Sequence, residues 1–257
     1  MPGAGRGRAT GRPTAIAANF VTSIIESKMY PQAVSISSDL IQYLRDLYVT
    51  SFNDIVVRNG NAENINGFTR HAIPAYIIAT SAVEAFLNEM FLSPAGRSFF
   101  KNISDDTKYW EWLEKVELPY KLILIPQLFL NRTFATNKPP YQDMKELIKL
   151  RNELIHYKMA FKEPNYVKDM KQKKIALDDV GTTWTHNVSS LKGIWWAHNT
   201  ICATIQELIS FSTPETHPLL AQLNGHNFYD PWPESFKDFE SIISLSGSPW
   251  PVTSRGA

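Results

Sequence analysis

Residues 141–161 read YQDMKELIKLRNELIHYKMAF and indicate a long helix, because the stretch is rich in good helix formers and contains no Gly or Pro. Pro139 and Pro140 come just before it, where the chain can turn into a helix. On a helical wheel drawn at about 100° per residue, Arg151 lies near the middle of a broad apolar arc. The arc consists of Leu147, Leu150, Leu154 and Tyr157 on one side of Arg151 and of Met144, Ile148, Ile155 and Met159 on the other. An arginine in that place needs an anion or good hydrogen-bond acceptors, since an unpaired buried charge is costly.

Asn152 and His156 lie one turn apart at the edge of this arc, on the polar side that also carries Lys145 and Lys149. A histidine adds a group that titrates near neutral pH, and an asparagine adds a neutral hydrogen-bonding group. Two interpretations are open at this point. Either Arg151, Asn152 and His156 form a functional site, or Arg151 closes a structural salt bridge and His156 is a surface histidine.

The run Arg151-Asn152-Glu153-Leu154-Ile155-His156 resembles the signature of the HEPN superfamily. In that signature an Arg followed by a polar residue is separated by a few positions from a His, late in a helical bundle. Residues 81–88, SAVEAFLN, look like the early helix with an acidic residue that many members have. Residues 118–140 look like the linker that such families place before the motif helix. The resemblance covers roughly residues 70–211.

This resemblance implies an all-α fold, an antiparallel helical bundle of HEPN type, and the apolar periodicity places the main helices at 73–92, 144–159 and 188–211. Glu84, in a narrow polar stripe of the first helix, is the candidate partner of Arg151; the alternative is that it binds another buried group. His198 falls in the apolar stripe of the last helix and is expected to be a core histidine. Residues 118–134 fit a strand or a helix by pattern, and the resemblance favours a helical or irregular connector.

Four segments are expected along the chain. Residues 1–14 are a disordered basic tail, 15–69 an N-terminal helical extension packed on the bundle, 70–211 the HEPN-like bundle, and 212–257 a C-terminal appendage. Residues 163–187 are expected to form a polar loop. The loop contains a cluster of lysines, Lys168, Lys171, Lys173 and Lys174. These lysines either contact an RNA backbone or are simply solvated.

The composition excludes several protein classes. With 257 residues, 44% of them hydrophobic, the chain can bury a substantial core, and its net charge of +1 carries no general signal for nucleic acid. Cys202 is the single cysteine, which permits no intrachain disulfide and fits a reducing compartment. No secretory signal and no apolar run of membrane-spanning length is recognisable. A cytoplasmic protein without a membrane segment is therefore expected.

The motifs of nucleotide-binding loops, of serine hydrolases and of HExxH metalloenzymes do not occur, and no cofactor or metal is expected. Arg151, Asn152 and His156 remain, and this set suits metal-free phosphodiester chemistry on RNA. There the 2′-hydroxyl attacks its own phosphorus, so that the enzyme needs a proton-transfer group and a cation for the developing charge. DNA lacks that hydroxyl, so the mechanism selects RNA.

The HEPN resemblance implies the same activity. Many members are metal-independent endoribonucleases in toxin–antitoxin or antiviral defence systems, with the active groove formed by two copies of the motif in a homodimer. RNA, a second copy and an antitoxin or defence-system protein are thus the expected partners. A branch that is modified by a nucleotidyltransferase has a Tyr two residues after the His, where this chain has Lys158. The competing hypothesis is a catalytically inactive HEPN-like module for dimerisation or for binding nucleotides or RNA.

Overall fold

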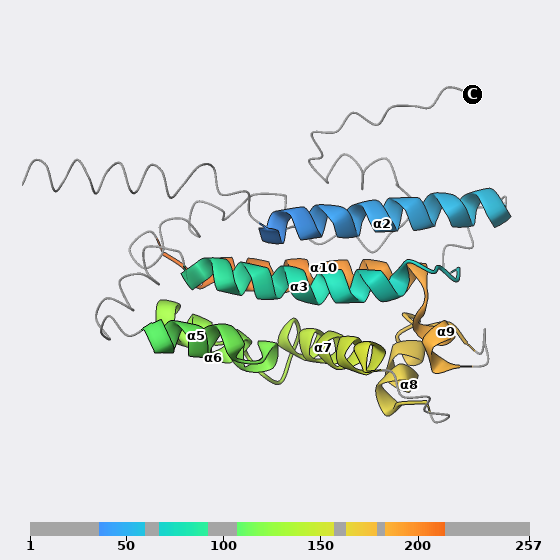
Figure 1. The fold of residues 1–257 in the computed structure, drawn as a ribbon. Helices are drawn as coiled ribbons and strands as arrows, with labels where there is room; N and C mark the ends of the chain where they lie inside the picture. Colours follow the sequence, from blue (N-terminus) through green and yellow to red (C-terminus); the bar gives the residue numbers. More distant parts are fainter. Residues whose placement is uncertain (1–35, 60–66, 92–106, 157–162, 179–182, 214–257) are drawn as a thin grey trace, which may run out of the picture. The chain divides into compact units, whose positions relative to one another are not determined.

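The structure is a computed structural model that describes residues 36–59, 67–91, 107–156, 163–178 and 183–213. These residues form α-helices joined by turns and contain no strand, only an isolated bridge between Phe68 and Ser190. The all-α class predicted from the sequence is confirmed for this part of the chain. The helices are α2 (Ile36–Asn59), α3 (Ala72–Phe91), α5 (Thr107–Lys115), α6 (Leu118–Leu130), α7 (Tyr141–Ile155), α8 (Asn165–Gln172), α9 (Trp184–Val188) and α10 (Leu191–Ser210) (Figure 1).

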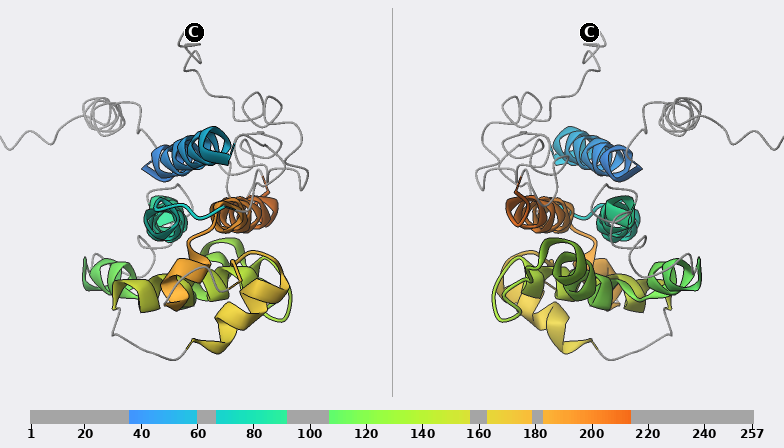
Figure 2. Two further views of the ribbon diagram at one scale, coloured as in Figure 1. Left: turned by 90° about the vertical axis from the view of Figure 1, so that its right-hand side faces the viewer. Right: turned by 90° about the vertical axis from the view of Figure 1, so that its left-hand side faces the viewer.

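Helix α3 lies at the centre of the fold, between α2 on one side and α6 and α7 on the other (Figures 1 and 2). Its composition explains this position, because most of its residues are apolar and four small residues recur along it at roughly helical spacing. These are Ala72, Ala75, Ala79 and Ala82, all fully buried. Small side chains let neighbouring helices approach closely.

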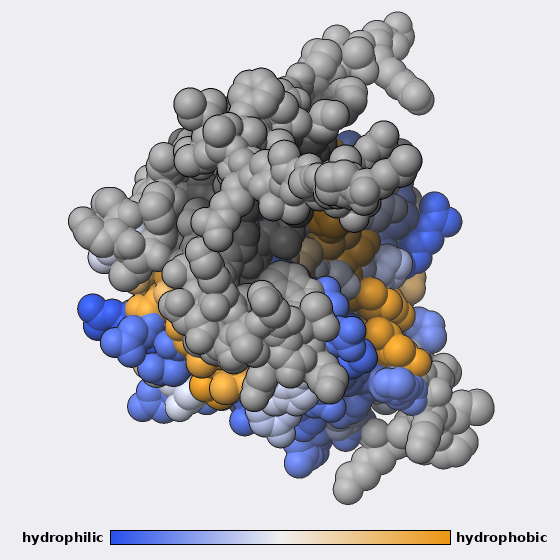
Figure 3. Space-filling view, turned by 60° about the vertical axis from the view of Figure 1, so that its left-hand side comes forward, coloured by the Kyte–Doolittle hydropathy of each residue, from blue (hydrophilic) through white to orange (hydrophobic). Residues whose placement is uncertain are grey.

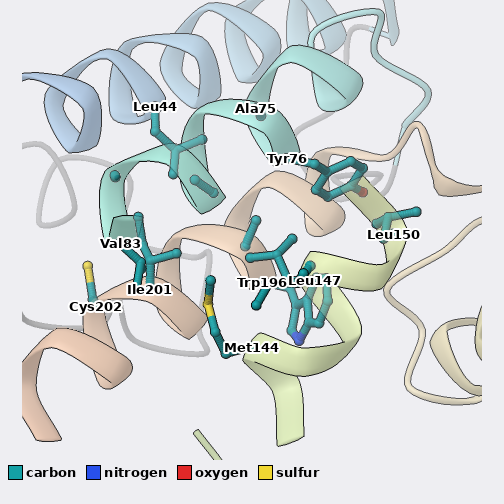
Figure 4. Close-up of a cluster of buried hydrophobic side chains, with 14 of the residues drawn as sticks. Leu44, Ala75, Tyr76, Val83, Met144, Leu147, Leu150, Trp196, Ile201 and Cys202 are labelled. Atoms are coloured by element: carbon teal, nitrogen blue, oxygen red, sulfur yellow. The ribbon is translucent and has the colours of Figure 1, made fainter. Parts of the chain in front are cut away.

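Helices α3 and α10 run side by side in the same direction. Both begin at the bridge between Phe68 and Ser190, and further along Val83 lies beside Ile201 (Figure 4). Helix α2 runs the opposite way across them, since Ser37 at its start donates to Glu89 near the end of α3. The helices are therefore not antiparallel throughout, which differs from the predicted arrangement. Residues 36–59, predicted as an extension, contribute to the same hydrophobic core as α3 and α10.

Gly193 is required where α10 starts against α3. A Cβ at this position would overlap the Tyr76 hydroxyl and lie 3.0 Å from Ser190 Oγ. The Tyr76 hydroxyl donates to the Val188 carbonyl at 2.5 Å. Ser190 Oγ caps α10 by accepting a hydrogen bond from the Gly193 amide at 2.8 Å. The close approach fixes the relative position of the two long helices.

The motif helix α7 begins at Tyr141, directly after Pro140, as the sequence predicts. It buries Met144, Leu147, Ile148 and Leu150 against the bundle. The helix ends at Ile155, earlier than predicted, because His156 leaves the helical conformation at φ −97° and ψ 29°. The end of the predicted helix, with Tyr157 and Met159, lies outside the described residues.

Residues 118–134 are helical over most of their length, so the connector is α6 rather than a strand. Pro119 sits in the first turn, where its missing amide is harmless. Asn131 ends the helix in the left-handed conformation, at φ 51°, which asparagine tolerates better than most residues.

The prediction of a polar loop at 163–187 is wrong for the described residues. Helix α8 spans Asn165–Gln172 and α9 spans Trp184–Val188. Tyr166, Val167 and Met170 form one buried face of α8 at helical spacing, while the residues of the outer face are polar or charged. The lysines make the stretch look uniformly polar, which conceals this short apolar face.

His198 is a core histidine, as predicted, and is fully buried between α10 and α2. Its Nε2 accepts a hydrogen bond at 3.0 Å from Nε of Arg45, which is itself 2% exposed. Burial, and then the positive charge of Arg45, lower the pKa of His198 to about 3 despite a hydrogen bond to Asn199. The imidazole is therefore neutral in the folded protein at physiological pH, and its Nε2 accepts the hydrogen bond from Arg45.

Candidate functional site

A pocket of about 350 Å³ opens between the end of α5, the start of α6 and the end of α7. Arg151, Asn152 and His156 all line it, and so does Glu84 from the middle of α3. The structure therefore brings together the three residues predicted as catalytic and the one predicted to support them. The other lining residues come from the end of α5, the connection to α6, the first turn of α6 and the apolar face of α7; they are Glu114, Lys115, Val116, Glu117, Leu118, Pro119 and Ile148.

The last turn of α7 places the three motif residues at the pocket. Arg151 is half-buried, and its Nε is buried without a hydrogen-bond partner among the described residues. Asn152 and His156 are exposed. A buried donor without a partner is uncommon in folded proteins, and here it belongs to a side chain that can hold a phosphate or carboxylate through several N–H groups.

Glu84 does not form the predicted ion pair with Arg151. Its Oε1 instead accepts a hydrogen bond at 2.9 Å from Nζ of Lys121, on α6. Asn88, one turn along α3, accepts a second bond from the same ammonium at 3.1 Å. The alternative, that Glu84 binds another buried group, is the one observed, because Lys121 is 1% exposed and therefore needs the carboxylate more than the half-buried Arg151 does.

Lys121 does not line the pocket but binds Glu84, which does, and sequence reasoning missed this role. The signal was present, since Lys121 is the only charged residue in the apolar run LPYKLILIP, residues 118–126. A lysine in such a run is either exposed on one face or buried with a partner. The ion pair fixes the Glu84 carboxylate at the pocket wall and ties α6 to α3.

The pocket carries charges of both signs. Three carboxylates line it, from Glu84, Glu114 and Glu117, together with the cations of Lys115 and Arg151. Lys121 adds a third cation beside Glu84, so the charges balance. Such a site suits a ligand that offers one anionic group to Arg151 and hydrogen-bond donors to the exposed carboxylates of Glu114 and Glu117.

The four lysines predicted to contact RNA do not line the pocket. Lys171 forms an ion pair at 2.9 Å with Glu163, and Lys173 contacts Glu146 at 3.0 Å and Asp143 at 3.5 Å on α7. Burial alone would lower the pKa of Lys173, but the hydrogen bonds and charges of Glu146 and Asp143 raise it above its ordinary value. The other two, Lys168 and Lys174, are exposed.

Large apolar side chains lie exposed within two positions of pocket residues in the sequence. Trp112 on α5 is 57% exposed, Tyr120 on α6 is 61% exposed and Ile155 on α7 is 49% exposed. Trp110 and Trp112 lie two apart on one helix and cannot share one face, so the sequence predicts that one of them is exposed. Trp112 is exposed, and the side chain of Trp110 lies outside the described part of the structure. Figure 3 shows hydrophobic residues lying between hydrophilic ones on one face of the molecule.

Within the described residues no helix is both long enough and apolar enough to cross a membrane. The same residues contain no group of three or more His, Cys, Asp or Glu side chains arranged to hold a metal ion. Comparison of the chain with known protein families, with curated proteins and with solved structures found no match.

Proposed function

We propose that the chain is a metal-independent endoribonuclease of the HEPN type that acts in the cytoplasm. The observation that supports this activity is the convergence of Arg151, Asn152 and His156 on one pocket of about 350 Å³. A cation, a neutral hydrogen-bonding group and an imidazole suffice for transfer of a phosphoryl group to the neighbouring 2′-hydroxyl.

In the proposed reaction His156 takes the proton of the 2′-hydroxyl, and the 2′-oxygen forms a bond to phosphorus. Arg151 holds the non-bridging oxygens, whose negative charge grows in the transition state. The bond from phosphorus to the 5′-oxygen then breaks, and that oxygen receives a proton from a second imidazole or from water. The products are a 2′,3′-cyclic phosphate and a 5′-hydroxyl, so no oxidant, reductant or cofactor is consumed.

A homodimer supplies the second imidazole in this proposal. The exposed Trp112, Tyr120 and Ile155 lie within two positions, in sequence, of residues that line the pocket, and a second copy would cover apolar surface there. The two copies would bring two motif helices to one cleft. The biological setting that the HEPN resemblance suggests is a toxin or antiviral-defence effector, held in check by a partner protein.

The test is cleavage of single-stranded RNA by the purified full chain in excess EDTA. We expect cleavage to persist and to leave 2′,3′-cyclic phosphate ends or the 3′-phosphates formed from them. His156→Ala should reduce the rate by about 10²–10⁴-fold, the usual contribution of general acid–base catalysis, while the melting temperature stays close to that of the wild type because His156 is exposed. Dependence on Mg²⁺, or unchanged cleavage by His156→Ala, would contradict the proposal.

The alternative function is a HEPN-like module that dimerises or binds a nucleotide or RNA without cutting it. The three carboxylates in the pocket favour the dimerisation form of this alternative, because they repel the phosphate of any RNA or nucleotide that Arg151 attracts. The experiment above separates the two functions when RNA binding is measured alongside cleavage. Binding that depends on Arg151, without any cleavage by the wild type, would establish the alternative.

A further inference from the structure

The exposed side of α7 carries a narrow stripe of polar residues that leads into the pocket. On the helical wheel Lys145, Lys149, Asn152 and His156 fall within about 60° of one another, and all four are exposed. They recur at intervals of four, three and four residues. At a rise of about 1.5 Å per residue, the stripe extends over roughly 16 Å of the helix.

Asn152 and His156, at one end of this stripe, line the pocket. Lys145 and Lys149 lie at the other end, outside it. Lys145 forms no ion pair with any described residue, and Lys149 Nζ lies 5.1 Å from the centre of the Tyr166 ring rather than against a carboxylate. Both ammonium groups can therefore bind an anion without first breaking an ion pair to the described part of the chain.

Acidic residues of α7, Asp143, Glu146 and Glu153, lie on a neighbouring stripe of the helix, and residues of the α8 region contact them. Lys173 contacts Asp143 and Glu146, and the Tyr166 hydroxyl donates to Glu153 at 2.9 Å. Burial, with the hydrogen bond and charge of Glu153, raises the pKa of Tyr166, so its hydroxyl keeps the proton that it donates. The docking of α8 thus partly neutralises the acidic side of α7 and leaves its lysine side open.

We propose that Lys145 and Lys149 bind the phosphate backbone of single-stranded RNA as it enters the pocket along α7. This inference rests on the proposed function and adds a substrate class to it, namely single strands that continue beyond the reacting nucleotide. The volume of about 350 Å³ is at the small end for ligand sites, which suits one nucleotide taken from a single strand rather than a duplex. The proposed backbone contacts are thus on α7, and not on the lysines of the α8 region that the sequence suggested.

Binding is tested with an oligonucleotide that cannot be cleaved. A fluorescein-labelled 2′-O-methyl RNA of about 12 nucleotides, within the range that single-stranded sites cover, lacks the attacking hydroxyl. Its Kd for the full chain is measured by fluorescence anisotropy over a series of NaCl concentrations. Each phosphate contact with a single strand contributes about 0.7 to the slope of log Kd against log salt.

The variant Lys145→Gln/Lys149→Gln should lower that slope by about 1.4, and Lys145→Gln alone by about 0.7. The comparison variant is Lys168→Gln/Lys174→Gln, which removes two exposed lysines of the α8 region and changes the net charge equally. We expect it to lower the slope by less than half as much. An equal or larger effect from the comparison pair, an unchanged slope in the α7 pair, or no binding by the wild type would overturn the inference.

Failure of this inference differs from failure of the proposed function. A protein that binds the probe through Lys145 and Lys149 but cleaves no RNA retains the binding site and loses the nuclease proposal. A protein that cleaves RNA through His156 but shows no effect of the two lysines retains the nuclease proposal and loses the binding site.

Discussion

Lys121 Nζ lies 2.9 Å from Glu84 Oε1, and the two partners differ in exposure: 1% of the lysine side chain is exposed, compared with 36% of the glutamate side chain. The ammonium depends on this contact and on Asn88, because little water can reach it. The carboxylate, in contrast, stays in contact with water at the pocket. Loss of the two partners should therefore have unequal effects on the free energy of unfolding.

We expect Glu84→Leu to lower the free energy of unfolding by about 1.5–3 kcal/mol, the contribution of a hydrogen bond to a charged group. Lys121→Met should lower it less, since water can solvate the carboxylate that remains. The double variant should be more stable than Glu84→Leu alone, because it leaves no buried ammonium without a partner. Urea denaturation of the three proteins gives these values, and an additive double variant would show that the pair is not coupled.

Glu84→Gln separates stability from catalysis in the proposed nuclease. Glutamine keeps an acceptor for Lys121 but removes the charge. Because Glu84 is hydrogen-bonded to Lys121 rather than to Arg151, we expect this variant to lower the melting temperature and to change the cleavage rate little. A cleavage rate that falls by a hundredfold or more, roughly the smallest effect of losing a general acid or base, with an unchanged melting temperature, would instead place Glu84 in the chemistry.

His198 should make stability depend on pH. Its pKa is lowered from 6.5 to about 3 in the folded protein, so between these values the unfolded chain binds more protons at this residue than the folded chain does. The contribution to stability is complete above pH 6.5 and is lost as the pH falls towards 3. Between pH 7 and pH 5 the loss should be about 2 kcal/mol.

The check is the free energy of unfolding of His198→Gln at several pH values. Glutamine can still accept from Arg45 but does not titrate, so the dependence between pH 5 and pH 7 should become flatter by up to about 1.4 kcal/mol per pH unit. His186→Gln, at an exposed position, controls for the loss of one histidine. Equal slopes in the wild type and His198→Gln would contradict the burial of a neutral imidazole.

Gly193→Ala should destabilise the contact between α10 and α3. The added methyl group would overlap the Tyr76 hydroxyl, and an overpacked core site costs about 1–3 kcal/mol. The same substitution has a smaller effect in a Tyr76→Phe background, where that hydroxyl is absent. Gly67→Ala is a matched control, since its methyl group would meet only the side chain of Ile55, at 3.0 Å. Equal losses at both glycines would mean that the Tyr76 hydroxyl is not the obstacle.

The long helices were predictable because their signals are local. Helix α3 spans Ala72–Phe91, where 73–92 was predicted, and α10 spans Leu191–Ser210, where 188–211 was predicted. Both were found because uninterrupted apolar periodicity persists over several turns. The start of α7 after Pro140 followed from the sequence in the same way. His198 was identified as a core residue because it falls within an apolar stripe.

Pairing across the fold was not predictable by the same reasoning. The partner of Glu84 depends on which cation has the least access to water, and only the packing of α6 on α3 shows that this cation is Lys121. The short helix α8 escaped detection because its apolar face has three residues among lysines. The grouping of Arg151, Asn152 and His156 in one pocket follows from their spacing on α7, but the carboxylates of Glu114, on α5, and Glu117, just before α6, come from other parts of the fold.

The composite dimer site leads to a prediction that one inactive protein can rescue another. In Arg151→Ala the imidazole is intact, and in His156→Ala the guanidinium is intact. If the cleft uses residues from both copies of a two-fold dimer, mixing the two inactive proteins should restore part of the cleavage. The restored rate should stay below half of the wild-type rate, because about half of the dimers are mixed and each mixed dimer has one imidazole, so that water must protonate the 5′-oxygen.

Subunit exchange is verified by light scattering at micromolar concentration and by mixing differently tagged chains. The control is Arg151→Ala mixed with Arg151→Ala/His156→Ala, which carries no intact guanidinium in any combination and should stay inactive. A monomer in light scattering, or a dimer that exchanges subunits without regaining activity, would rule out the composite site. The pocket within one chain, where Arg151 and His156 already line the same cavity, would then have to hold all the groups that the reaction needs.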